Sequence, residues 1–245
     1  MEPIYQQDYF ISDSCVDRYG RLKPSMILFY AQEVAGQHCK ELALDYETLA
    51  EKQLFWAVTR HRVQISRTPM RGETIRVETW PMPTTKVAYP RSIVAYDEQG
   101  REVFRAITVW VLMNLDTRNM ILPGKSGIIV SGTLRGTELA SPRSLLPMVM
   151  KNHDSRTVRY TDLDRNGHMN NTRYFDWIDD LISSDYHRAH PVKEFTICYH
   201  SEAREGQTLD MNWEILDGPS VQVDGTRQNG DDTENRVFSA KVLFE

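Results

Sequence analysis

A polar run before residue 172 holds three side chains that could assist hydrolysis or proton transfer: Asp164, Asn166 and His168. They occupy alternate positions, so an extended segment would present all three on one face. An apolar helical stripe follows the run, and the first N–H groups of a helix have no partner inside the helix. Three polar side chains beside such donors could bind a carbonyl oxygen as it becomes negative. We therefore interpret this run as a candidate active site.

The same residues also fit a purely structural interpretation. Asp, Asn and Gly are common turn residues, and Asn is a favoured helix cap, so Asn170 or Asn171 could simply cap the following helix. The spacing alone does not distinguish the two interpretations, so features elsewhere in the sequence are needed to choose between them.

An internal repeat favours the functional interpretation. Three pairs of segments match in the same order: Asp164–Met169 with Asp17–Leu22, Gly206–Leu209 with Gly72–Ile75, and Phe238 and Ala240 with Phe104 and Ala106. We therefore expect two halves with one shared fold. Both copies of the first segment contain the Asp and the Gly, but the first copy has Tyr19 and Arg21 in place of Asn166 and His168. The fold explains the Asp and Gly, and the candidate chemistry lies with Asn166 and His168.

The elements around this run predict a helix followed by antiparallel strands in each half. Pro24 begins a helix that we expect to reach about Leu42, and β-branched and aromatic runs then predict strands. The expected strands are 55–65, 75–80, 92–96 and 105–115 in the first half, and 195–199, 209–216 and 238–244 in the second. We expect residues 224–236, rich in Gly, Asp, Asn and Glu, to form a long hairpin loop.

Composition narrows the class of protein. The net charge of −5 argues against a general nucleic-acid binder. The N-terminus has no secretory or transit pattern and no apolar run approaches the ~18 residues that span a bilayer, so we expect a cytoplasmic protein with no membrane span. The seven histidines show no zinc-like spacing, so we expect no metal and no cofactor. Cys15, Cys39 and Cys198 are widely separated, which fits reduced thiols.

At this point the chain resembles the acyl-acyl-carrier-protein thioesterases of plants and their bacterial relatives. The resemblance rests on several separated motifs in the right order: residues 32–38 (Q-E-V-A-G-Q-H), 56–60 (W-A-V-T-R), 77–80 (V-E-T-W), 105–114 (R-A-I-T-V-W-V-L-M-N) and 162–171 (D-L-D-R-N-G-H-M-N-N), then Tyr174 and Trp177. It covers nearly the whole chain.

The resemblance implies an α+β fold of two tandem hot-dog domains, each a long helix wrapped by an antiparallel sheet. We assign residues 1–116 to an acyl-chain-binding domain, 117–152 to a linker and 153–245 to a catalytic domain. As a pseudo-dimer, the chain would be a monomer or would form a homodimer. The likeliest lining of an acyl tunnel is the first-half helix and sheet, with Met26, Phe29, Tyr30 and Trp56 as candidates, although each also fits ordinary core packing.

The resemblance also implies hydrolysis of fatty acyl thioesters carried by acyl carrier protein. The family's functional residues fall on Asp164, Asn166, His168 and Glu202. Plant members carry a Cys directly after that Glu, where this chain has Ala203, so we expect direct attack by water. We expect Glu202 to be the general base in a partly apolar, desolvated setting, and backbone N–H groups near Asn170 and Asn171 to complete an oxyanion hole.

The individual roles of Asn166 and His168 stay interchangeable at this stage. An acidic carrier would need basic side chains, and the candidates are Arg60, Arg62, Arg67, Arg71, Arg143, Lys151, Arg156, Arg159 and Arg173. Three alternatives remain: an acyl-CoA thioesterase, a hot-dog dehydratase, and a module that binds acyl thioesters without turnover.

Overall fold

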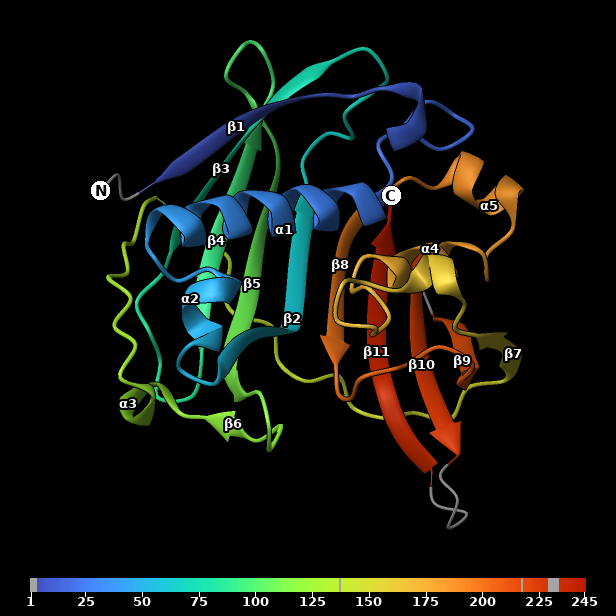
Figure 1. Cartoon of the computed structure of the whole chain (residues 1–245). Helices are drawn as coiled ribbons and strands as arrows, with labels where there is room; N and C mark the ends of the chain where they lie inside the picture. The colour runs from blue at the N-terminus through green and yellow to red at the C-terminus, as the bar shows by residue number, and fades with distance from the viewer. Residues whose placement is uncertain (1–3, 137, 217, 229–233) are drawn as a thin grey trace. The chain divides into compact units, whose positions relative to one another are not determined.

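The computed structural model describes residues 4–136, 138–216, 218–228 and 234–245 (Figure 1). The chain divides into two compact units, Met1–Pro142 (unit 1) and Arg143–Glu245 (unit 2). Each unit combines an antiparallel sheet with a few helices, so the α+β class predicted from the sequence is confirmed.

Unit 1 is an antiparallel sheet with one long helix against it. In chain order its strands are β1 (Tyr5–Phe10), β2 (Leu54–Ile65), β3 (Thr74–Pro81), β4 (Tyr89–Tyr96), β5 (Glu102–Asn114) and β6 (Met120–Ile121). Its helices are α1 (Pro24–Glu41), α2 (Tyr46–Ala50) and α3 (Pro123–Ser126), with a 3₁₀ turn η1 at Asp13–Cys15. The strands lie in the order β1-β3-β4-β5-β2, and β6 pairs with β5.

Helix α1 forms where the sequence predicts it. Pro24 occupies its first turn, where a missing N–H costs no intrahelical hydrogen bond. Ile27, Ala31 and Val34 recur at helical spacing and are buried, and the helix packs against β3 and β1.

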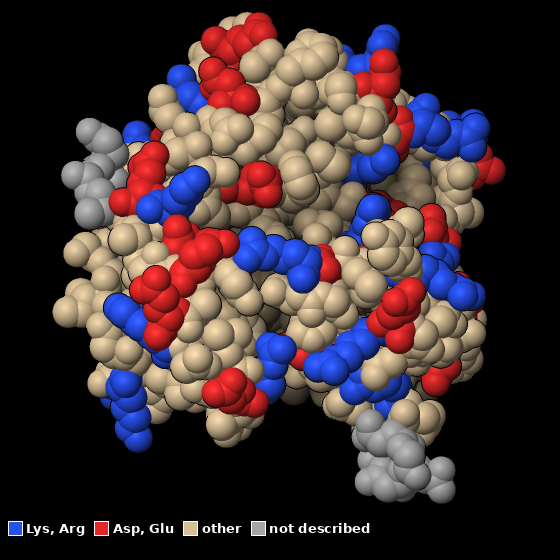
Figure 2. Space-filling model, in the orientation of Figure 1, with Lys and Arg blue, Asp and Glu red and all other residues tan. Residues whose placement is uncertain are grey.

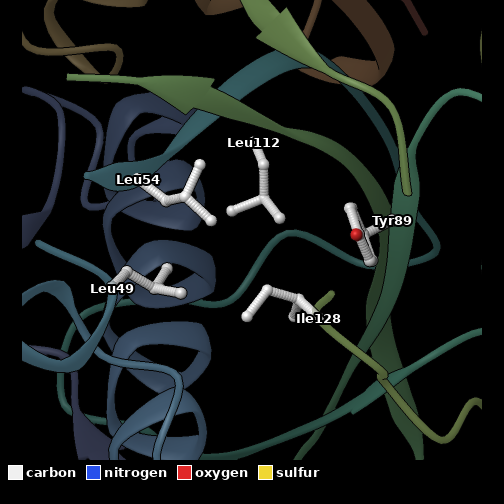
Figure 3. Close-up of a cluster of buried hydrophobic side chains, with 5 residues drawn as sticks. All are labelled: Leu49, Leu54, Tyr89, Leu112 and Ile128. Carbon is white, nitrogen blue, oxygen red and sulfur yellow. The ribbon is translucent and has the colours of Figure 1, made fainter. Parts of the chain in front are cut away.

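A cluster of buried side chains joins α2 to the sheet of unit 1 (Figure 3). Its members come from α2, β2, β4, β5 and the segment after α3, and their side chains point toward one another: Leu49, Leu54, Tyr89, Leu112 and Ile128. This cluster is part of the packed core that holds the sheet's shape.

Unit 2 repeats the plan of unit 1 with a shorter helix. Its strands are β7 (Asn152–Thr157), β8 (Val192–Tyr199), β9 (Thr208–Leu216), β10 (Ser220–Gln228) and β11 (Glu234–Phe244). Its helices are α4 (Arg173–Asp179) and α5 (Ser184–Ala189), with a 3₁₀ turn η2 at Tyr160–Asp162. The strands lie in the order β8-β11-β10-β9-β7.

The two units share one topology. Replacing β1, β2, β3, β4 and β5 by β7, β8, β9, β10 and β11 converts the strand order of unit 1 into that of unit 2. Even the register shifts coincide, at Ala95/Tyr96 in β4 and at Gly225/Thr226 in β10. The internal repeat predicted from the sequence is therefore confirmed.

The helix of unit 2 is much shorter than the long helix expected. Asp179 and Asp180 place negative charge at the C-terminal end of α4, where the helix dipole disfavours it. The Ser183 side chain then accepts a hydrogen bond from the N–H of Tyr186 and caps α5 as a separate helix. The apolar stripe predicted after the polar run is thus divided between α4 and the turn that follows it.

The prediction of a long loop over residues 224–236 is wrong at both ends. β10 continues to Gln228 and β11 begins at Glu234, while residues 229–233 lie outside the described residues. Polar residues of β10 are buried and have partners on other elements: Asp224 Oδ1 accepts from Arg236 Nη2 of β11 at 2.5 Å, and Gln222 Nε2 donates to the Leu146 carbonyl at 3.0 Å. The polar residues of β10 give this strand a composition typical of a loop, which explains the wrong prediction.

Candidate active site

Residues 163–169 form a tight turn that Asp164 organises. The N–H of Asp164 donates to the His168 carbonyl at 2.8 Å, and the N–H of Gly167 donates to the Asp164 carbonyl at 3.0 Å. Asp164 Oδ1 accepts from the N–H groups of Asn166 (2.8 Å) and His168 (3.2 Å). Gly167 has φ of 74°, a left-handed conformation that glycine adopts readily. The segment is therefore a turn and not the extended run that alternation suggested.

Unit 1 makes the same turn with the same hydrogen bonds. The N–H of Asp17 donates to the Arg21 carbonyl at 2.8 Å, and Asp17 Oδ1 accepts from the N–H groups of Tyr19 (2.8 Å) and Arg21 (2.9 Å). Gly20 has φ of 76°. This agreement bears out the prediction that the Asp and the Gly of the motif belong to the fold.

A second loop, residues 200–207, packs against the turn and carries Glu202. His168 pairs with Arg204 in an isolated β-bridge, and the N–H of Met169 donates to the Ala203 carbonyl at 2.8 Å. This pairing places His168 Nε2 3.1 Å from Glu202 Oε2. Two residues singled out from the sequence, 34 positions apart in the chain, are therefore in direct contact.

The surroundings of Glu202 differ from the expected desolvated setting. Its side chain is 41% exposed, whereas that of His168 is 13% exposed. Arg204 Nη2 also lies 3.7 Å from Glu202 Oε2. The carboxylate therefore sits at a water-accessible edge of the site, held by one imidazole and approached by one guanidinium.

The three asparagines of the motif have different positions. Asn166 is exposed, and its Nδ2 lies 3.5 Å from Asp164 Oδ2. Asn170 Oδ1 accepts from both the N–H and the hydroxyl of Thr172 at 3.0 Å, so this side chain orders the start of α4. The Asn171 carbonyl accepts from the Tyr199 hydroxyl at 2.9 Å.

The backbone donors near the helix start are mostly committed. The N–H of Asn170 donates to the Asp162 carbonyl at 2.8 Å, so it is not a free oxyanion donor. The N–H groups of Met169, Thr172 and Arg173 are also bonded. Across residues 169–173, all of them described, the N–H of Asn171 is the one without a hydrogen-bond partner.

Two further residues lie at the site that sequence reasoning did not place there. Tyr174, one of the residues that carry the family resemblance, is buried against Tyr199 and Phe238. Burial raises the pKa of the Tyr174 hydroxyl. The charge of Arg227 lowers this pKa, and the charges of Asp164 and Glu202 raise it. Arg227 of β10 donates to the Glu202 carbonyl at 3.1 Å. The sequence predicts a loop over residues 224–236, so it assigns Arg227 to no strand and gives no sign that this residue contacts Glu202.

The four acyl-chain candidates lie at two different places in unit 1. Met26, Phe29 and Tyr30 belong to α1, where Phe29 is 41% exposed and Tyr30 is buried with its ring 4.3 Å from that of Tyr9. Trp56 of β2 packs against the cluster of Figure 3, and its Nε1 donates to the Leu44 carbonyl at 2.9 Å.

A metal ion and a cysteine nucleophile are two other ways in which such a site could work. Within the described residues no group of three or more His, Cys, Asp or Glu side chains could hold a metal ion. Cys198, the cysteine of unit 2, is buried in β8 with its Sγ 3.8 Å from the Arg143 carbonyl. Ala203, directly after Glu202, is fully buried and has no nucleophilic atom.

Family models match most of the chain. Residues 2–122 match the acyl-ACP thioesterase N-terminal domain, and residues 148–239 match the acyl-ACP thioesterase C-terminal domain. The chain belongs to the acyl-ACP thioesterase family. The resemblance recognised in the sequence is therefore confirmed.

Curated relatives in plants support this membership. The chain is 28% identical over 209 residues to a chloroplastic acyl-[acyl-carrier-protein] hydrolase of Cuphea viscosissima, covering 80% of this chain and 50% of that protein. It is 29% identical over 232 residues to the palmitoyl-acyl carrier protein thioesterase of Gossypium hirsutum, covering 87% and 55%. The chain spans about half the length of these curated relatives.

Solved structures confirm the fold. An acyl-ACP thioesterase from Bacteroides thetaiotaomicron matches with a TM-score of 0.89 at 23% identity, covering 99% of this chain and 98% of that chain. The 12:0-ACP thioesterase from Umbellularia californica matches with a TM-score of 0.83 at 22% identity, covering 100% and 98%. The predicted tandem hot-dog architecture is confirmed by these neighbours and by the shared topology of the two units. No helix in the described part of the chain is long and apolar enough to cross a membrane.

Proposed function

We propose that this protein hydrolyses fatty acyl-acyl-carrier-protein thioesters to free fatty acid and holo-acyl-carrier protein. The observation that carries the proposal is the contact between His168 Nε2 and Glu202 Oε2 at 3.1 Å. The same turn in unit 1 has Arg21 where unit 2 has His168, and Arg21 is bridged to Met70. Family membership and the names of the plant relatives support the choice of substrate.

Glu202 is the general base of the proposed mechanism. Its carboxylate takes a proton from a water molecule, and the resulting hydroxide attacks the thioester carbonyl carbon. His168 holds the carboxylate through its Nε2, so its first role is to orient Glu202. Water can reach the carboxylate because the side chain is 41% exposed.

Attack on the carbonyl carbon creates a tetrahedral intermediate with a negative oxygen. The N–H of Asn171 and the amide of Asn166 are the donors we assign to that oxygen, because Asn171 offers the unbonded N–H at the start of α4 and the Asn166 side chain is exposed in the same motif. Collapse of the intermediate breaks the carbon–sulfur bond and releases the carrier's thiolate, which then takes up a proton. Asp164 serves indirectly, because its Oδ1 fixes the backbone of both Asn166 and His168.

Because we assign catalysis to unit 2, we assign binding of the acyl chain to unit 1. We keep the proposed boundaries of 1–116 for acyl-chain binding, 117–152 for the linker and 153–245 for catalysis. Phe29 and Trp56 are the candidates we favour for contact with the chain, since Phe29 is 41% exposed and Trp56 is only partly buried. Tyr30 is buried against Tyr9, which fits core packing better.

The carrier protein is the proposed partner, and several of the basic side chains that are candidates for docking it pair with acidic side chains of this chain. Lys and Arg atoms lie among Asp and Glu atoms over the face drawn in Figure 2. Five of the basic candidates form ion pairs: Arg67 with Glu73, Arg71 with Asp13, Lys151 with Glu214, Arg156 with Asp180 and Arg173 with Asp176. Binding of the carrier should still weaken with salt if charge contributes to docking.

The remaining expectations stay predictions. They are a cytoplasmic location, no metal or cofactor requirement, no nucleic-acid partner, and a monomer or homodimer.

The test is to incubate the pure protein with a panel of acyl-carrier-protein thioesters of different chain lengths and identify the products. We expect free fatty acids and free carrier thiol. Faster kcat/KM on the matching acyl-CoA thioesters would favour the CoA alternative. Loss of water without release of thiol would favour a dehydratase, and binding with no turnover would favour a binding module.

A further inference from the structure

Arg227 joins the loop of the proposed base to the sheet of unit 2. Its Nη1 donates to the main-chain carbonyl of Glu202 at 3.1 Å and to Gln207 Oε1 at 2.6 Å. Gln207 Oε1 also accepts from the N–H of Arg204 at 2.9 Å. The loop is therefore fastened on both sides of Ala203, at Glu202 directly and at Arg204 through Gln207.

The equivalent corner of unit 1 has the opposite arrangement of charge. Arg227 follows the β10 shift at Gly225/Thr226, and Asp97 follows the β4 shift at Ala95/Tyr96. A guanidinium in unit 2 thus takes the place of a carboxylate in unit 1. Asp97 is buried and pairs with Arg67 at 3.4 Å and with Arg101 at 2.9 Å.

The loop positions change in the complementary direction. Arg67 of unit 1 corresponds to Ser201 of unit 2, since their N–H groups donate to Val103 and Val237, equivalent residues of β5 and β11. Glu73 corresponds to Gln207, and each accepts from the N–H three residues before it.

Unit 1 therefore carries the cation, Arg67, and one carboxylate, Glu73, on the loop, and a second carboxylate, Asp97, at the end of the strand. Unit 2 carries the cation on the strand and neutral side chains on the loop at Ser201 and Gln207. Either arrangement of charged and neutral side chains could stabilise this corner of the sheet if the corner were needed only for folding. The arrangement in unit 2 is the one that sends a guanidinium to the main chain of Glu202.

We propose that Arg227 is a positioning residue for the hydrolytic reaction, which holds the Glu202 main chain so that its carboxylate faces His168. This assignment rests on the proposed function. Gln207 contributes because it accepts from Arg227 without the charge of a carboxylate, so it orients the guanidinium and leaves it bonded to the Glu202 carbonyl. Arg227, the residue that follows the register shift in β10, is thus a further residue that makes unit 2 the catalytic one.

The geometry predicts a loss in turnover when Arg227 is removed. A displacement of a catalytic group by about 1 Å can reduce the rate by as much as a factor on the order of 10². We expect Arg227→Met to lower kcat by a factor on the order of 10 to 10², with KM little changed because the acyl chain binds elsewhere. Arg227→Lys should recover part of the loss, since an ammonium keeps the charge but lacks the fixed fork of donors.

The experiment measures kcat and KM of these variants on an acyl-carrier-protein thioester that the wild type hydrolyses. The matched control is Arg236→Met on the neighbouring strand, because Arg236 also anchors a main-chain carbonyl, that of Leu145 at 2.7 Å. We expect the control to lose thermal stability while keeping kcat. Gln207→Glu, which copies the residue of unit 1, should fold normally and lower kcat, because the new carboxylate would draw the guanidinium away from the Glu202 carbonyl.

A double-variant comparison separates positioning from an independent role. If Arg227 acts through Glu202, Arg227→Met should cause no further loss in a Glu202→Ala background. Equal losses in both backgrounds would overturn the assignment, and so would a wild-type kcat in a folded Arg227→Met variant. Absence of hydrolysis by the wild type itself would instead overturn the proposed function, and the assignment with it.

Discussion

Two turns of the molecule, Asp17–Leu22 in unit 1 and Asp164–Met169 in unit 2, have the same backbone and different side chains. In both, the Asp Oδ1 accepts two N–H groups and a glycine adopts a left-handed conformation. In both, the fifth residue of the turn bridges to the loop that leads into the next strand. That fifth residue is Arg21 in unit 1 and His168 in unit 2.

The comparison separates the scaffold from the chemistry. Wherever a feature occurs in both turns, the fold alone accounts for it. A feature of unit 2 alone needs another reason, and His168 facing Glu202 is such a feature, since the loop residue equivalent to Glu202 in unit 1 is Thr68. Substitutions at equivalent residues of the two units test this separation, with unit 1 as the control for unit 2.

The largest difference between the units should appear at Glu202. Glu202→Ala removes the proposed base and should lower kcat by a factor on the order of 10² or more. Thr68→Ala, at the equivalent position of unit 1, should leave kcat within about twofold of the wild type, because no chemistry is assigned there. Steady-state hydrolysis of an acyl-carrier-protein thioester measures both, with circular dichroism to check the fold. Near-normal turnover by Glu202→Ala would remove Glu202 from the mechanism.

A smaller difference is expected one step away, at His168. His168→Ala deletes the imidazole that holds Glu202 Oε2 at 3.1 Å and should lower kcat by roughly tenfold to a hundredfold, at or below the lower end of the range for a group that itself transfers the proton, because His168 acts through Glu202. Arg21→Ala in unit 1 should have no comparable effect on turnover. His168→Gln offers a further check, because an amide can still donate to the carboxylate and should recover part of the rate. Equal losses from Arg21→Ala and His168→Ala would show that both turns matter only for folding.

The equivalence of the two turns can be predicted from the sequence, because the internal repeat preserves the spacing of the Asp and the Gly. Apolar periodicity, the internal match and the family motifs predict helix α1, most strands and the tandem fold, which the structure confirms. They also single out His168 and Glu202, whose catalytic roles stay predictions. The structure brings these two residues into contact, with His168 Nε2 3.1 Å from Glu202 Oε2.

The features missed from the sequence have two different physical causes. Strand β10 contains buried polar residues whose partners lie on other elements, as when Gln222 donates to the Leu146 carbonyl. No local pattern marks such a strand, so Arg227 was not recognised. The shape of the Asp164 turn was also misjudged, because alternate spacing predicts a shared face only if the backbone is extended. Asp-x-x-Gly favours a turn instead, and the chain uses it a third time at Asp97–Gly100.

The smallest effect should come from the part of the motif that both turns share. Asp17→Ala and Asp164→Ala each leave two backbone N–H groups without their side-chain acceptor. By analogy with the loss of a helix cap, each should reduce the free energy of unfolding by about 1–2 kcal/mol. That loss corresponds to a fall in Tm of roughly 2–8 °C for a chain of this size, measurable by thermal denaturation.

Turnover then distinguishes the two equally destabilised variants. Asp164→Ala should also lower kcat, because the backbone that it orders carries Asn166 and His168. Asp17→Ala should keep kcat at temperatures where it is folded, since the side chains on its turn are Tyr19 and Arg21. A loss of kcat in Asp17→Ala equal to that in Asp164→Ala would mean that the turn of unit 1 also serves the reaction. The separation of scaffold from chemistry would then fail at its simplest point.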